Sequence, residues 1–146
     1  MKPPFDVRYV LVSDYATIDH TGKLIIAGLY TEDLVVPVAP LLLSSLVITV
    51  LAKPPKSKIN FQLSLLAPND SIIAGGAGEM EPVESLKGSN ARAILGFQFN
   101  QIVLPESGNY RIVVAETASP DNQIKIHDFN LVINPEGHAR AMALPR

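Results

Sequence analysis

The sequence predicts an all-β protein, specifically an antiparallel immunoglobulin-like β-sandwich of about seven to nine strands. Two observations predict this class. Short runs with apolar residues at alternate positions recur between turn residues, and no segment sustains apolar residues at helical spacing. In addition, Tyr110 begins a late strand, as the tyrosine of a tyrosine corner does. The cysteine pair and core tryptophan of antibody domains are absent.

The first element, residues 7–30, is predicted to be a hairpin that is apolar on both faces of its strands. Apolar residues occupy both parities of 7–12 and of 24–29, and residues 19–22 supply turn chemistry. A strand at the surface of one domain is ordinarily apolar on one side only. We therefore expect the second face to be covered by this chain or by another molecule. The residues expected at such an interface, where they are not in the core, are Val10, Val12, Ile25 and Leu29.

Residues 34–52 are nineteen consecutive uncharged positions, close to the roughly 20 that a membrane-spanning helix needs. Pro37 and Pro40 interrupt the run, and its second half is rich in β-branched residues. We therefore predict two strands, 34–36 and 45–52, joined by a crossing that the prolines mark, and no membrane span. The second of these strands is again apolar on both faces.

Residues 59–65 form the cleanest half-buried strand, because apolar and polar side chains alternate there. A strand at 71–74 follows, and the glycine-rich stretch Gly75–Gly88 is predicted to be a long loop. The stretch is a poor phosphate-binding loop, because acidic residues follow where a lysine is needed. An alternative role is to bind a small ligand or Ca²⁺ through carbonyl and carboxylate oxygens. The candidate residues in this loop are Glu79, Glu81 and Glu84.

Two later strands each change their apolar parity once, which indicates a bulge. In residues 93–104 the change falls at Asn100 and Gln101. In residues 124–133 it falls at His127 and Asp128. We therefore expect one bulge in each strand.

Length and turn signals predict one domain over residues 1–137, followed by a C-terminal tail over 138–146. A chain of 146 residues can bury one core without disulfides. The first six residues carry two prolines and no apolar run, so neither a signal peptide nor a transit peptide is expected. The absence of cysteine favours the cytoplasm.

Composition excludes some classes of partner. Twelve basic and fourteen acidic residues give a net charge of −2, and Lys and Arg form no run. The chain therefore lacks the basic surface that nucleic acids or anionic membranes attract, and we expect neither as a partner. Apolar residues make up 47% and charged residues 18%, which favours association with a protein or with further copies of the chain.

The sequence offers no catalytic residue, metal-ligand set or cofactor motif. Three histidines are present, none at the spacing of a helical zinc site. His127 beside Asp128 would make an imidazole oriented by a carboxylate, but no nucleophile motif accompanies it. A hydrolase centred on this pair is the weakest hypothesis, and we expect a protein that is not an enzyme.

Two stretches of the sequence carry a resemblance to a known family. The first comprises Val10–Ala16, Asp19, Gly22, Lys23, Leu24 and Gly28. The second comprises Pro105, Gly108, Tyr110 and Arg111. They resemble the start and the final hairpin of a family of uncharacterised bacterial or phage β-sandwich proteins, a domain of unknown function. The resemblance implies a single sandwich domain and assigns no functional residue.

The function expected from the sequence is therefore a non-enzymatic protein–protein interaction or assembly module, homo-oligomeric and of unknown process. The two-sided apolarity of residues 7–30 and 46–51 supports it. The alternative is a β-sandwich that binds a small ligand or Ca²⁺ through the 75–88 loop.

Overall fold

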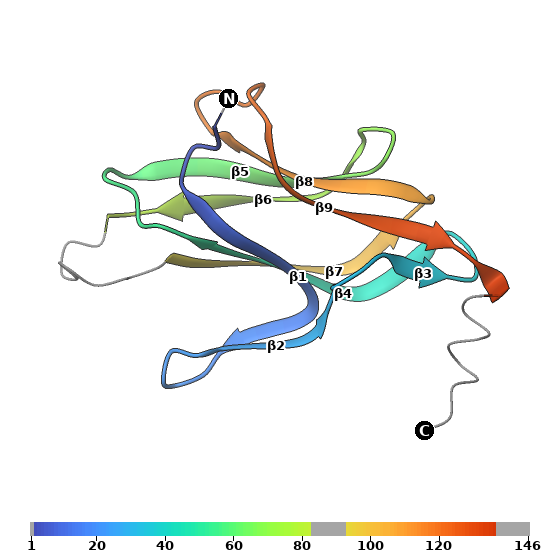
Figure 1. Ribbon diagram of the computed structural model, residues 1–146. Coiled ribbons are helices and arrows are strands. Elements are labelled where there is room, and N and C mark those ends of the chain that lie inside the picture. The colour runs from blue at the N-terminus through green and yellow to red at the C-terminus, as the bar shows by residue number, and fades with distance from the viewer. Residues whose placement is uncertain (1, 83–92, 137–146) are drawn as a thin grey trace.

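A computed structural model describes residues 2–82 and 93–136, which form nine strands in two facing sheets (Figure 1). The all-β class and the upper end of the expected strand number are confirmed. The strands are β1 (Val7–Ile18), β2 (Leu24–Leu29), β3 (Leu34–Val36), β4 (Leu41–Ala52), β5 (Ile59–Leu66), β6 (Ile72–Met80), β7 (Ala93–Leu104), β8 (Gly108–Glu116) and β9 (Ile124–Ile133).

Sheet A has the order β2-β1-β4-β7, and sheet B has the order β3-β9-β8-β5-β6. Sheet B is curled, like half of a barrel, over sheet A (Figure 1). The expectation of purely antiparallel sheets is wrong at one place, because β3 runs parallel to β9. After the first hairpin, the chain crosses from sheet A to sheet B, where β3 forms the edge strand beside β9.

The core lies between the sheets and draws on both. Val12, Ile48 and Val50 come from sheet A, whereas Leu63 and Ile112 come from sheet B, and all five side chains are fully buried. The crossing predicted within 34–52 is confirmed, because β3 belongs to sheet B and β4 to sheet A. Of the described residues, none form a helix long and apolar enough to span a bilayer.

The parity change predicted in β7 is present, but it does not shift the pairing. Phe97 and Phe99 pack against the core before the change, and Ile102 is buried after it. Gln101 has a positive φ of 54°. The partner strand makes the same change around Ser45, so Leu43 still pairs with Ile102 and Leu46 with Phe99. β4 and β7 therefore change parity at the same paired position. The bulge expected in β7 alone is not found there.

The second predicted bulge is confirmed in β9. Ile112 pairs with His127, but Val113 pairs with Lys125, so Ile126 is the extra residue. A bulge re-aims the side chains that follow it. Here it lets Ile126 pack against the core while Phe129 and Leu131, of the other parity, are also buried.

The expected loop over Gly75–Gly88 is wrong for its first part, because residues 75–80 belong to β6. The remainder from residue 83 lies outside the described residues. The glycines of β6 leave room for aromatic rings rather than mark a loop. A Cβ atom at Gly76 would lie 3.1 Å from Cδ1 of Phe97, and a Cβ atom at Gly78 would overlap the ring of Phe61.

We expect Gly78→Ala to destabilise the protein by about 1–3 kcal/mol, the usual cost of overpacking. Phe61 is fully buried and packs on Phe5 and Phe97, with ring centroids 4.8 and 6.1 Å away, so its ring has little room to move. Urea unfolding measures the change. Gly96→Ala is the matched control in another strand, because a Cβ atom there meets nothing within 4 Å. An equal loss in both variants would contradict the packing explanation.

Candidate functional site

Strand pairing decides which side chains of sheet A face away from the core. Thr49 at the centre of β4 lies between Leu11 of β1 and Gly96 of β7. Residues that are directly paired in neighbouring strands share a face of the sheet. Since Val12 and Ile48 are in the core, the residues of the opposite parity form the outer face.

We call this surface the outer face. Three rows across β1, β4 and β7 make it up, and Leu29 of β2 extends one row beside Ser13. All ten side chains are uncharged, and most are apolar. The outer face consists of Tyr9, Leu11, Ser13, Leu29, Val47, Thr49, Leu51, Ile94, Gly96 and Gln98.

The middle of the outer face is buried and its rim is exposed, because Ser13 and Val47 are 0% and 4% exposed. Tyr9 and Leu29 at the rim are 57% and 43% exposed. At the centre, Thr49 is buried, and its Oγ1 atom has no hydrogen-bond partner in the described part of the chain. Beside it, the space where a side chain of Gly96 would lie is open. The row Leu11–Thr49–Gly96 therefore has open space at its β7 end.

The structure separates the four interface candidates of the sequence. Ile25 and Leu29 are 47% and 43% exposed, but Val12 is only 1% exposed and belongs to the core. Val10 is half-buried and packs against the core as well. Val10 and Val12 face inward because they pair with Val50 and Ile48, which fill the core. Neither of these two residues therefore lies on the outer face.

Sequence reasoning missed other members of the outer face. Tyr9 and Leu11 have the parity opposite to Val10 and Val12, and both parities are apolar, so local alternation does not distinguish them. Gly96 and Ile94 lie in the predicted strand 93–104, where no sequence signal marks them as part of a surface. The signal that could have found the face is the two-sided apolarity of residues 46–51, because it marks the central strand of a sheet that is apolar on both sides.

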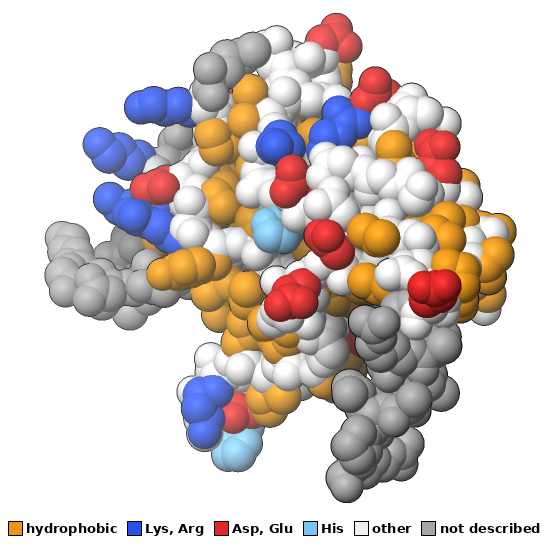
Figure 2. Space-filling view, turned by 45° about the vertical axis from the view of Figure 1, so that its right-hand side comes forward, with side chains coloured by type: hydrophobic (Ala, Val, Ile, Leu, Met, Phe, Trp, Pro, Cys, Tyr) orange, Lys and Arg blue, Asp and Glu red, His pale blue; other side chains and the backbone are white. Residues whose placement is uncertain are grey.

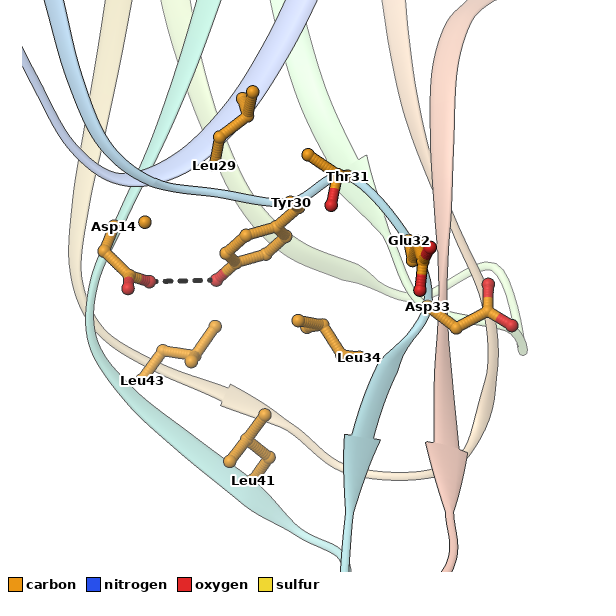
Figure 3. A pocket seen from close by; sticks show the side chains of 10 residues that line it. Asp14, Leu29, Tyr30, Thr31, Glu32, Asp33, Leu34, Leu41 and Leu43 are labelled. Carbon is orange, nitrogen blue, oxygen red and sulfur yellow. Dashed lines mark hydrogen bonds between the residues drawn. The ribbon is translucent and has the colours of Figure 1, made fainter. Parts of the chain in front are cut away.

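A second feature is a pocket of about 440 Å³ at one end of the molecule, which we call the end pocket (Figure 3). Leu34, Leu41 and Leu43 gather on one side of the Tyr30 ring, and Leu29 points away from it (Figure 3). All three leucines are half-buried and pack against the core. The carboxylates that line the pocket are Asp14, Glu32 and Asp33.

Asp14, Gly28 and Tyr30 form the base of the end pocket. The Tyr30 hydroxyl donates a hydrogen bond to Oδ1 of Asp14 at 3.5 Å. Gly28 has a φ of 68°, which favours glycine, and a Cβ atom there would overlap the Asp14 carboxylate. The Tyr30 ring contacts Phe129 edge-on, with centroids 5.7 Å apart. Gly28 in β2 thus leaves room for the Asp14 carboxylate of β1, which faces the Tyr30 hydroxyl.

The carboxylates of the end pocket lack a cationic partner within the described ranges, where no ion pair involves Asp14, Glu32 or Asp33. Asp33 accepts a hydrogen bond from Nδ2 of Asn130 at 3.1 Å. In Figure 2, acidic side chains lie among hydrophobic ones across the middle of the visible face, and most lysines and arginines lie toward its left and top. Among residues 2–82 and 93–136, no group of three potential metal ligands is found.

We expect Tyr30 to make the unfolding free energy depend on pH in the alkaline range. Burial, and then the charge of Asp14, raise the pKa of Tyr30 to about 12 from an ordinary 10. Below pH 10 the Tyr30 phenol is protonated in both the folded and the unfolded state, so its contribution to the unfolding free energy is fully present. Above pH 10 the unfolded chain ionises first, so stability falls until the pH passes about 12. The stability advantage of wild type over Tyr30→Phe should shrink across this window in denaturant titrations, and a constant difference would contradict the assignment.

Two of the three acidic candidates of the 75–88 stretch lie in the part of the chain that the structure describes. Glu79 lies in β6 and makes an ion pair with Lys58 at 3.0 Å, which raises the pKa of the lysine. Glu81 follows the end of β6, and Glu84 lies outside the described residues. The loop on which the Ca²⁺ alternative depended is thus partly a strand, and one of its carboxylates is neutralised.

His127 and Asp128 lie at the bulge of β9 but are not joined as a catalytic pair. Asp128 accepts a hydrogen bond from Nζ of Lys125 at 3.1 Å, which lowers the pKa of this carboxylate. Burial lowers the pKa of His127, and the charge of Asp128 opposes that shift. The Asp128 carboxylate is thus bound to the lysine of its own strand.

The fold and these surfaces define an all-β protein of two facing sheets whose outer face is apolar and whose end carries an acidic pocket. Residues 8–127 match a family of unknown function, DUF6941. The chain belongs to this family. No curated protein matches the sequence.

Proposed function

We propose that this protein is a non-enzymatic assembly module that binds a second copy of itself through the outer face. The observation that carries the proposal is the row Leu11–Thr49–Gly96, which lies at the centre of ten uncharged side chains. Soluble monomers rarely expose contiguous apolar patches larger than a few hundred Å². Interface centres are depleted in charge, as this face is.

A second copy is the partner that fits the outer face best. A surface without charge offers no electrostatic selection for a charged partner. The rim of one copy can fit against the centre of another, because large rim residues such as Tyr9 and Ile94 surround a centre made small by Gly96. Two such sheets packed face to face would insert the rim of one into the centre of the other at the usual sheet separation of about 10 Å.

Gly96→Arg tests the proposal. The position has open space and no positive φ, so an arginine is compatible with the fold. The charge would be desolvated without a partner at the centre of a face-to-face dimer, so we expect the dissociation constant to rise at least about 100-fold. Sedimentation equilibrium measures the mass, and circular dichroism checks the fold.

Gly96→Ala is the matched variant and should retain association, because one methyl group fits the open space. If wild type is monomeric at high micromolar concentration, the proposal is wrong. It is also wrong if wild type is oligomeric and Gly96→Arg leaves its mass unchanged.

We further propose that the fold is of the immunoglobulin kind. The order β1-β4-β7 against β9-β8-β5 supports this, because it follows strands A, B and E against G, F and C. The Tyr110 hydroxyl donates to the carbonyl oxygen of Glu106 at 2.6 Å, as a tyrosine corner requires. We also propose the bacterial or phage origin that the resemblance implies, and a cytoplasmic location.

A further inference from the structure

The end pocket exists because the first hairpin turns away from sheet A. β1 pairs with β4 only as far as Ser13, which lies opposite Val47, and from Tyr15 onward it pairs with β2 alone. The chain then crosses to sheet B through residues 30–33, so space remains between the hairpin and the start of β4 (Figure 1). The volume of about 440 Å³ lies in the range of small-molecule sites.

The middle of the end pocket is apolar on two sides. The Tyr30 ring forms one side, and Leu34, Leu41 and Leu43 gather on the other (Figure 3). The three leucines pack against the core but are only half-buried, so part of their apolar surface faces the pocket. A slot between an aromatic ring and aliphatic side chains suits an unbranched alkyl chain, because it removes that chain from water on both sides.

The two ends of this apolar slot are anionic. Asp14 lies at the hydroxyl end of the Tyr30 ring and accepts its hydrogen bond, whereas Glu32 lies beyond the opposite end of the ring (Figure 3). Both carboxylates are exposed, and within the described ranges neither takes part in an ion pair. The Asp14 carboxylate lies beside Gly28, four residues before Glu32, so the backbone spans at most about 14 Å between the two ends.

We propose that the end pocket binds a linear aliphatic diammonium ion, that is, a diaminoalkane or a longer polyamine. One ammonium group pairs with Asp14, the other pairs with Glu32, and the alkyl chain lies between the Tyr30 ring and the leucines. Asp33 also lines the pocket, but its carboxylate already accepts a hydrogen bond from Asn130, so Glu32 is the freer partner. A metal ion leaves the apolar slot unused and a monoamine leaves one carboxylate unpaired, so both are weaker ligands.

Titrations followed by amide NMR spectra at pH 7 and low salt test the proposal, since alkylamines carry their proton there. Diamines from 1,4-diaminobutane to 1,8-diaminooctane establish the best chain length. The comparison probes are the monoamine of that length, which has one charge fewer, and Mg²⁺, which has the same charge and no chain. We expect saturable shifts of the Asp14, Tyr30 and Leu43 signals, with a Kd for the best diamine about 2- to 5-fold below that of the monoamine, as one exposed ion pair allows. Mg²⁺ should bind more weakly than the diamine.

Two substitutions separate the ends of the pocket. Asp14→Asn and Glu32→Gln keep the size of each side chain and remove its charge, and asparagine still accepts the Tyr30 hydrogen bond. Either change should reduce the affinity of the diamine to that of the monoamine on wild type. Asp121→Asn is the matched control and should change neither, because this exposed carboxylate lies between the end of β8 and the start of β9, whereas the pocket lies near the start of β8. Thermal melting checks that all three variants fold.

Several results would overturn the proposal. One is the absence of saturable shifts in the pocket signals with every diamine. Another is a monoamine or Mg²⁺ that binds as tightly as the best diamine, because the site would then recognise a single cationic group or charge alone. An equal loss of affinity in Asp121→Asn and Asp14→Asn would show a general effect of surface charge and would overturn it as well.

The proposal goes beyond self-association but shares one residue with it. Leu29 lines the end pocket and belongs to the outer face, so association through that face changes one wall of the pocket. The titrations are therefore run on wild type and on Gly96→Arg, with the mass of each measured by sedimentation. If the mass is unchanged in Gly96→Arg and both proteins bind the diamine, self-association through the outer face is wrong and diamine binding holds. If Gly96→Arg is a monomer and neither protein binds the diamine, the reverse is true.

Discussion

Val12→Lys should unfold the protein at room temperature. Val12 is 1% exposed and pairs with Ile48, which is fully buried, so a lysine ammonium at this position would be buried without a partner. An uncompensated buried charge costs several kcal/mol, and a domain of this size is stable by only about 5–15 kcal/mol. Loss of the β-sheet signal in far-ultraviolet circular dichroism, together with flat thermal scans, would be the expected result.

Leu11→Lys is the matched control, because Leu11 is adjacent in sequence but belongs to the outer face. Its lysine can extend into solvent in the monomer, so the fold should persist while the mass measured by sedimentation falls to that of one chain. A folded Val12→Lys variant would place Val12 outside the core. If both variants unfold and wild type is monomeric, the outer face is covered from within the chain and the assembly proposal fails.

The second large effect is expected for Tyr110→Ala, which should cost about 3–5 kcal/mol of unfolding free energy. The Tyr110 side chain is fully buried, and its ring stacks on Phe129 with centroids 5.5 Å apart and planes 9° apart. Its hydroxyl donates to the carbonyl oxygen of Glu106 at 2.6 Å and accepts from the Glu106 amide at 3.3 Å. The substitution removes a large core ring and leaves both backbone groups of the turn without these bonds.

Tyr110→Phe separates the two contributions. It retains the ring and its stacking but removes the hydroxyl, so we expect a loss of about 1 kcal/mol. Chemical denaturation measures both variants against wild type. A loss below about 1 kcal/mol for Tyr110→Ala would show that the ring is not packed in the core, and it would remove one support for the immunoglobulin kind of fold.

The sequence by itself determined the all-β class and the position of most strands. Alternation in residues 59–65 and the parity changes at Gln101 and His127 are local properties of a strand, and they are visible without knowing its neighbours. The buried environment of Tyr110 was also predictable, because the turn before it has a recognised pattern. The sequence likewise indicated that the first hairpin is apolar on both sides.

Only the tertiary structure decided which of those sides is the outer face. The parity of β1 depends on its register with β4, which is a contact between residues about forty positions apart, so Val12 and Leu11 looked equivalent until they were paired. The glycines of β6 predict a loop but form a strand for a similar reason, because the rings of Phe61 and Phe97 that occupy the space beside them come from other strands. The end pocket also brings Asp14, Asp33 and Leu43 together from separate segments. Local periodicity sets the shape of each strand, whereas burial depends on what packs against it, and packing is a property of the whole chain.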